Sequence, residues 1–139
     1  MVTQMTSYSC YDVAMAILRH PDFRLDDPTD IPYMLNYLAF YCQVYACGSL
    51  FQEDFEAWVH GPVVPELLRA LTNANLPQPV KPLDADAQSI VDSVMDDMAG
   101  YDKLDLRYMA KEEEAYQLTR EGLAVDEPCN RVIPKELLR

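Results

Sequence analysis

The sequence predicts a mainly α-helical protein, folded as a single compact domain of five to six helices with a short extended segment or small β-hairpin around residues 50–60. Three observations favour this class. The chain has 139 residues, of which 50% are hydrophobic, enough to bury one core. Apolar residues recur at helical spacing in segments separated by prolines and isolated glycines. Alternation typical of a strand occurs only briefly, between Phe51 and Val59.

The first helix is predicted over residues 9–19. Ser9, followed three residues later by Asp12, resembles a capping box with the shorter acid. Apolar residues then follow at one-face spacing from Val13 to Leu18. The helix is expected to stop before Pro21, because the residue before a proline is disfavoured in the helical conformation.

The second helix is predicted over residues 31–45 and is apolar on most faces, which is typical of a central helix. Asp30 can cap it, Pro32 fits its first turn, and Gly48 is expected to end it. Tyrosines recur every four residues along it. Such a stripe indicates either core packing with hydroxyls that reach the rim or a ligand pocket, and its members are Tyr33, Tyr37, Tyr41 and Tyr45.

The middle of the chain contains the extended segment. Residues 51–59 contain a brief alternation, in which Phe55, Ala57 and Val59 are opposed to Glu56, Trp58 and His60, and the Gly61-Pro62 dipeptide is predicted to turn the chain after them. A third helix then follows over residues 65–73, with Pro65 in its first turn.

The last third of the chain is predicted to be helical after a linker. Residues 76–82 contain three prolines and are expected to be extended. A fourth helix runs from about Asp84 to Gly100, with one apolar and one acidic face. A further helical region covers residues 105–123, with Asp105 as its capping residue, and a short closing helix begins at Pro134.

The formal net charge of −12 narrows the possible partners. It disfavours nucleic acid, because the protein would repel a phosphate backbone. No apolar run is long enough for a membrane span, and the N-terminus lacks the pattern of a signal peptide, so we expect a soluble cytoplasmic protein. An acidic surface favours encounter with a basic protein. The acidic positions that could steer such a partner are Asp92, Asp96, Asp97 and Glu112 to Glu114.

The cysteines predict no metal centre. There are four of them, and their positions match none of the spacings of a zinc site. Cys10 and Cys42 lie within apolar segments, where a reduced thiol behaves as a small buried hydrophobe. We therefore expect free thiols in a reducing compartment, with no metal and no cofactor.

His60 is the main candidate for chemistry, since an imidazole beside a turn can be a general base or a metal ligand. The other histidine, His20, is on a different predicted corner, and the nearby Ser49 matches no hydrolase motif. The favoured interpretation is structural, with the ring hydrogen-bonded to backbone groups at the turn. The acidic run of residues 112–114 is interpreted as a solvated face, paired with Lys111 or Arg120, rather than as paired catalytic carboxylates.

One segment resembles a known family. The stretch LFQEDFEAWVHGPVVPELLRAL is similar to the central signature of the Panacea domain, found in SocA-like antitoxins and their phage-associated relatives, in which a G-x-x-LF-x-E-x-FEAW-x-HGPVVPE pattern follows an apolar helix. The matching positions are Gly48, Leu50, Phe51, Phe55, Glu56, Ala57, Trp58, His60, Gly61, Pro62, Val63, Val64, Pro65 and Glu66.

The flanking segments resemble the same family, so the likeness spans nearly the whole chain. YDVA near the N-terminus resembles the opening helix, and MAKEEEAYQLTR aligns with a segment of the form LTHxExPWxxAR, keeping Glu113 and Arg120. The chain departs from that segment in three places. Lys111 stands at its histidine, Ala115 at its proline and Tyr116 at its tryptophan. If Trp58 and the aromatic residue at position 116 pack together, tyrosine keeps most of that contact.

The resemblance implies an antitoxin, which binds a cognate protein toxin and neutralises it without catalysis. Some relatives are adaptors that deliver a client to an ATP-dependent protease, and a hydrolase that uses His60 is the least favoured alternative. Trp58 is interpreted either as an interface residue, together with Tyr33 or Tyr37, or as part of the core, and the partners considered include a second copy of the chain in a homo-oligomer. The candidate partner-binding or signature residues are Trp58, His60, Gly61, Pro62, Val63, Pro65, Glu66, Glu113, Tyr116 and Arg120.

Overall fold

The computed structural model describes residues 8–25 and 27–139, and within them the chain is a mainly helical single domain with a two-stranded antiparallel hairpin, as predicted. Residues 1–7 and 26, which belong to the predicted N-terminal stretch and first loop, lie outside the described residues. The helices are α1 (Cys10–Leu18), α2 (Ile31–Tyr45), α3 (Pro65–Thr72), α4 (Ala85–Met98), α5 (Lys103–Glu112) and α6 (Glu114–Thr119). The strands are β1 (Glu56–Trp58) and β2 (Gly61–Val63), and short 3-10 helices cover Pro28–Asp30 and Lys135–Leu137.

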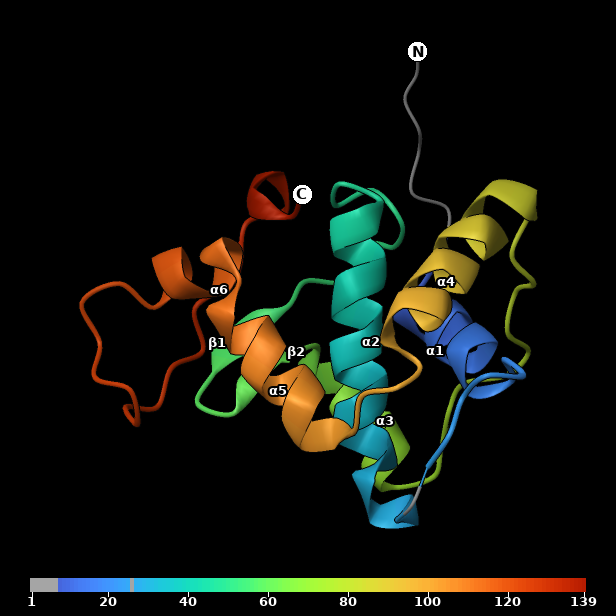
Figure 1. Ribbon diagram of the computed structural model, residues 1–139, viewed down its shortest axis with the longest axis horizontal. Helices are drawn as coiled ribbons and strands as arrows, with labels where there is room; N and C mark the ends of the chain where they lie inside the picture. Colours follow the sequence, from blue (N-terminus) through green and yellow to red (C-terminus); the bar gives the residue numbers. More distant parts are fainter. Residues whose placement is uncertain (1–7, 26) are drawn as a thin grey trace.

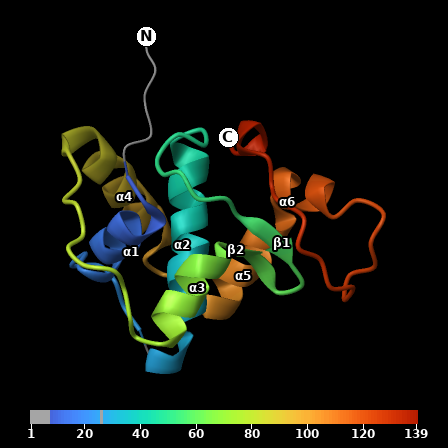
Figure 2. The same cartoon turned by 180° about the vertical axis from the view of Figure 1, so that it is seen from behind.

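Helix α2 is the centre of the fold (Figure 1). It contacts α1, α3, α4, α5 and β2, which explains why its sequence is apolar on most faces. Helices α1 and α4 lie on one side of it, whereas the hairpin, α5 and α6 lie on the other, and the view from behind shows the same division (Figure 2). The long segment after α6 extends away from α2 on the hairpin side.

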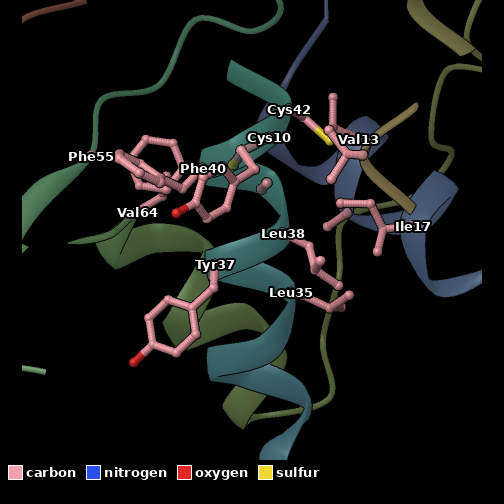
Figure 3. Close-up of a cluster of buried hydrophobic side chains, with 14 of the residues drawn as sticks. Cys10, Val13, Ile17, Leu35, Tyr37, Leu38, Phe40, Cys42, Phe55 and Val64 are labelled. Atoms are coloured by element: carbon pink, nitrogen blue, oxygen red, sulfur yellow. The ribbon is translucent and has the colours of Figure 1, made fainter. Parts of the chain in front are cut away.

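The core joins these two sides through α2 (Figure 3). Val13 and Ile17 of α1 pack against one side, and Phe55 and Val64, which flank the hairpin, reach the other. The rings of Phe40 and Phe55 meet edge to face with centroids 5.4 Å apart, a favoured aromatic geometry.

Two buried amide side chains hold the hairpin region to α2. Asn36 is fully buried, and its Oδ1 accepts the backbone N–H of Val64 at 2.8 Å. Gln43 is also fully buried; its Nε2 donates to the Phe51 carbonyl and its Oε1 accepts the Leu50 N–H. Both ends of the chain segment that contains the hairpin are therefore fixed to α2 by buried hydrogen bonds, which set the position of the hairpin along the helix.

The start of α1 follows the predicted capping chemistry and α4 starts at the predicted position, whereas the last helical region differs from the prediction. Ser9 and Asp12 form a reciprocal capping box, and Asp84 caps α4. The predicted single helix over residues 105–123 is wrong. Asp102 is the capping residue of α5, and the chain breaks at Glu113, which is extended with φ −67° and ψ 139°, before α6 begins.

The end of α2 also differs in detail from the prediction. The left-handed residue directly after the cap is Cys47, with φ 54°, and Gly48 follows it with φ 81°. The N–H of Gly48 donates to the Gln43 carbonyl and that of Cys47 to the Val44 carbonyl, which is the Schellman pattern. A side chain at Gly48 would place its Cβ 2.6 Å from the Lys135 carbonyl oxygen, so glycine is required by the close approach of the C-terminal segment.

The tyrosine stripe of α2 is mainly core packing. Tyr37 and Tyr41 are buried, whereas Tyr33 and Tyr45 are partly exposed at its two ends. Burial and the hydrogen bond to Glu113 raise the pKa of Tyr41 well above its usual range. The hydroxyls of Tyr37, Tyr41 and Tyr45 donate to residues outside α2, as expected for tyrosines whose tips reach the rim.

The free thiols and the lack of a membrane-spanning helix among the described residues agree with the expectations from the sequence. All four cysteines are free, and Cys10 and Cys42 are buried, which raises the pKa of each of these two thiols. Of the helices in residues 8–25 and 27–139, none combines the length and the apolar character that a bilayer crossing requires.

Candidate functional site

The candidate site is the hairpin that contains the signature residues. Strands β1 and β2 pair with Trp58 opposite Gly61, so the connecting turn is Val59-His60. The predicted turn at Gly61-Pro62 is displaced, because both residues lie in β2. Gly61 has φ 124°, and a Cβ there would meet the Tyr37 ring at 2.9 Å, so this position requires glycine for both conformation and space.

Side chains from α2 and α6 hold the carbonyl groups of this turn. Tyr37 donates its hydroxyl to the His60 carbonyl at 2.6 Å. Tyr116 donates to the carbonyls of Trp58 at 2.5 Å and Val59 at 3.3 Å. Hydrogen bonds to backbone carbonyls at a turn remove its freedom to change conformation, so the turn is a preformed corner rather than a flexible loop.

Arg120 holds the same hairpin from its other side. It is only 8% exposed, and its Nη1 donates to the Ala57 carbonyl at 2.8 Å. Its Nη2 donates to the carbonyls of Ala124 and Glu127, at 3.0 Å and 2.6 Å. The guanidinium therefore joins β1 to the segment after α6, with its charge compensated by carbonyl dipoles.

The acidic run 112–114 behaves differently from the predicted pairing. Glu113 accepts the hydroxyl of Tyr41 at 2.9 Å, and Arg120 donates to carbonyls instead of to this run. Glu112 and Glu114 are exposed, which agrees with a solvated face. Among the predicted site residues, Glu113, Tyr116 and Arg120 are therefore supports for the corner and for α2.

The corner borders a hollow of about 300 Å³. Trp58 is half-buried, and its indole N–H donates to Glu56 Oε1 at 2.8 Å, which fixes the orientation of the ring. His60 is exposed at the rim. Most of the wall is apolar or aromatic, and the lining residues are Tyr33, Trp58, Val59, His60, Gly61, Val63, Pro128 and Cys129.

The other signature residues separate into core and surface. Gly61, Pro62 and Val63 are buried in β2, and Pro65 begins α3. Glu66 is exposed on the first turn of α3 and does not line the hollow. The structure thus brings Trp58, His60, Gly61 and Val63 together and leaves Glu66 apart.

His60 differs from its predicted structural role. Its backbone carbonyl accepts from Tyr37, but its ring makes no hydrogen bond to any described residue. In particular, no carboxylate of these residues orients the imidazole, as a general base would require. Because the residue is exposed and its ring has no partner among the described residues, the imidazole is available to water or to a binding partner.

The second histidine belongs to another part of the molecule. His20 follows α1, and its Nε2 lies 3.1 Å from the Asp92 carboxylate of α4, while its Nδ1 accepts the N–H of Asp22. Asp92 is thus partly engaged, and α4 lies across α2 from the hairpin (Figures 1 and 2). Within residues 8–25 and 27–139, no three His, Cys, Asp or Glu side chains are close enough to hold a metal ion.

Three contributors to the hollow lay beyond the signature. The sequence suggests Tyr33 only as a residue that could join Trp58 at an interface, and no sequence pattern identifies Pro128 or Cys129 as site residues. They reach the hairpin because residues 131–133 run antiparallel beside β1, with the N–H of Ala57 bonded to the Arg131 carbonyl and Glu56 bridged to Val132. That pairing joins residues more than seventy positions apart, which local sequence patterns do not encode.

The chain has no match among known proteins in the comparisons made: no family model, no curated protein and no solved structure matches it.

Proposed function

We propose that this chain is a protein-binding module that acts as an antitoxin and neutralises a cognate toxin by direct contact at the Trp58–His60 corner. The observation that carries the proposal is that some signature residues are structural and others face the surface. Its aliphatic residues and glycines build the corner, whereas Trp58 presents the surface of its ring and His60 an unbonded imidazole to a hollow. The similarity of the same segment to Panacea-domain antitoxins supports the choice of partner class.

The physical properties of the corner suit binding. Carbonyls of its turn and of β1 are already bonded to Tyr37, Tyr116 and Arg120, so little conformational entropy is lost when a partner docks. A hollow of about 300 Å³ accommodates one large apolar side chain, and a partly exposed tryptophan is the residue type most enriched in interface hot spots. Neutralisation needs a stable interface, typically about 800 Å² on each partner, and no turnover.

The charge distribution supports a basic partner. The net charge is −12, and α4 presents exposed Asp96 and Asp97. These groups are on the far side of α2 from the corner, so they contribute to long-range attraction rather than to direct contact. We infer action in a reducing cytoplasm, which agrees with the buried free thiols of Cys10 and Cys42.

The test is co-expression with the product of the adjacent gene. That product is expected to stop growth alone and to be harmless beside the wild-type chain. Trp58→Ala is expected to abolish the rescue, because removing a hot-spot tryptophan costs about 2 kcal/mol or more, roughly a thirtyfold loss of affinity. Tyr101→Ala, which removes an exposed aromatic ring after α4, is the matched control and should rescue normally.

The outcomes separate the alternatives. A neighbour that is harmless alone contradicts the antitoxin proposal, and full rescue by a folded Trp58→Ala variant contradicts the corner as the contact surface. Rescue that disappears in a host without ATP-dependent proteases identifies an adaptor instead of a direct inhibitor. A His60→Ala variant that still binds the toxin but loses a measurable turnover would favour the hydrolase alternative.

A further inference from the structure

We propose that Arg107 binds an acidic side chain of the partner. An apolar side chain next to that acid enters the hollow at the same time. This inference rests on the proposed protein-binding function and names the chemistry of the bound segment. It follows from how Arg107 is held, from what its guanidinium leaves unpaired and from the charge of the rest of the chain.

Arg107 is held in place by two aromatic residues of α2. It lies on α5 and is half-buried. Its Nε donates to the Tyr37 hydroxyl at 3.0 Å, and its Cζ lies 5.8 Å from the centre of the Tyr33 ring. Such contacts orient the planar guanidinium and reduce the side-chain entropy that binding would otherwise cost.

The same contacts place Arg107 beside the hollow. Tyr33 is part of its wall. Tyr37, which accepts from Arg107, donates in turn to the carbonyl of His60 at the rim. A guanidinium, a phenol and a turn carbonyl are thus linked by two consecutive hydrogen bonds. Because those two bonds are 3.0 Å and 2.6 Å long, Arg107 Nε lies less than about 6 Å from the His60 carbonyl oxygen at the rim, a span that two neighbouring side chains of one bound segment can cover.

The terminal nitrogens of Arg107 have no partner in the protein. Neither a carboxylate nor a carbonyl of the described residues accepts from Nη1 or Nη2. Because those residues contain no buried side-chain nitrogen without a hydrogen bond, both groups are accessible to solvent. Arg120 offers the contrast, since its two terminal nitrogens are bonded to backbone carbonyls.

Among the arginines of the described residues, Arg107 alone lies over an aromatic ring and leaves both terminal nitrogens unpaired, in a chain whose 23 acidic residues outnumber its 11 basic ones. A partner carboxylate is repelled by most of the surface but can form a two-bonded pair at Arg107. The site would therefore fix the register of an otherwise basic partner. An acidic side chain is favoured over a chain-terminal carboxylate, because terminal capture uses clustered backbone N–H groups, whereas the turn presents carbonyls.

The test uses a displayed library of random peptides, so it does not depend on the identity of the toxin. The immobilised chain is the target, as wild type and as Arg107→Gln, Arg107→Lys, Trp58→Ala and the matched control Arg69→Gln, an exposed arginine of α3 that does not line the hollow. Wild type and Arg69→Gln are expected to enrich peptides with Asp or Glu beside a large apolar residue. Arg107→Gln should lose the preference for the acid, and Trp58→Ala should lose the preference for the apolar residue.

Synthetic peptides from the enriched set then give the magnitude. Replacing the acid by its amide is expected to weaken binding to wild type by about tenfold and binding to Arg107→Gln by less than about twofold, the difference expected of one charged hydrogen-bonded pair. Arg107→Lys, which keeps the charge without the fork, should be intermediate and provides a second variant if Arg107→Gln fails to fold.

The outcomes bear on this inference separately from the proposed function. Peptides that depend on Trp58 but show no acid, or an acid preference unchanged in a folded Arg107→Gln, overturn the role of Arg107 while leaving the corner as a binding site. Enrichment only of peptides with a free C-terminus overturns the side-chain assignment. Failure of toxin rescue in the co-expression assay overturns the antitoxin proposal, whatever the library selects.

Discussion

Arg120 allows the rigidity of the corner to be tested quantitatively. In an Arg120→Met variant the buried carbonyl of Ala57 loses its charged donor, which costs about 2 kcal/mol. The carbonyls of Ala124 and Glu127 belong to exposed residues and can be rehydrated, so their loss costs about 0.5 kcal/mol each. The free energy of unfolding is expected to fall by about 3 kcal/mol, and the melting temperature by roughly 10 °C.

Two further variants separate the geometry from the charge. Arg120→Lys keeps the charge, but one ammonium group cannot donate to the Ala57 carbonyl and to the 124–127 carbonyls on the other side of the guanidinium at once. A loss of about 1 to 2 kcal/mol is expected. Arg131 also donates to two carbonyls but is exposed, so Arg131→Met should cost less than about 0.5 kcal/mol.

The assay is urea unfolding followed by the fluorescence of Trp58, the single tryptophan of the chain, which sits on the hairpin that Arg120 supports. Amide hydrogen exchange of residues 121–132 reports the local effect, since their protection should fall most in Arg120→Met. An Arg120→Met variant within about 1 kcal/mol of wild type, or no more destabilised than Arg131→Met, would refute the reasoning.

Three other predictions concern stability. Gly61→Ala should destabilise the fold by about 2 kcal/mol in urea unfolding, because the left-handed backbone and the Tyr37 ring at 2.9 Å both oppose a Cβ; unchanged stability would contradict this. Asn36→Leu should cost about 1 to 3 kcal/mol by leaving a buried N–H unpaired, and a neutral result would mean that water replaces the amide. Burial, and to a smaller extent the hydrogen bond to Asp97, raises the pKa of Tyr45 to about 12. The folded state therefore favours the neutral phenol over the phenolate. That contribution is present below pH ~10 and is lost as the pH rises through about 12, and Tyr45→Phe should make stability less dependent on pH in this window.

Local chemistry made much of the helical framework predictable. Ser9 with Asp12, Asp84 before its apolar stripe, and Pro65 in a first turn each specify a helix start within a few residues. The last helical region was mispredicted because Asp105 also fits a cap; in the structure it is the third residue of a box begun by Asp102. At the break, Glu113 accepts a hydrogen bond from Tyr41, a residue 72 positions away in the sequence.

The candidate site was predictable in part for the same reason. The signature identified Trp58 and His60, and the structure places both beside Gly61 in the hairpin, with the turn two residues earlier than predicted. The roles of Tyr116 and Arg120 as carbonyl donors required the fold, because their acceptors lie 58 and 63 positions away. Cys129 and Arg107 had no sequence signal, since each matters only through what it is placed beside.

By itself, then, the sequence determined the class of fold, most helix starts and the identity of the hairpin, since capping, proline geometry and apolar periodicity act within a few residues. Tertiary structure alone decided where the hollow forms. It also decided that Arg120 donates to backbone carbonyls whereas the terminal nitrogens of Arg107 stay unpaired. The physical reason is that these properties depend on pairing between distant segments: residues 131–133 against β1, and α5 against the tyrosines of α2. The energy of such contacts appears only when the chain has closed around α2.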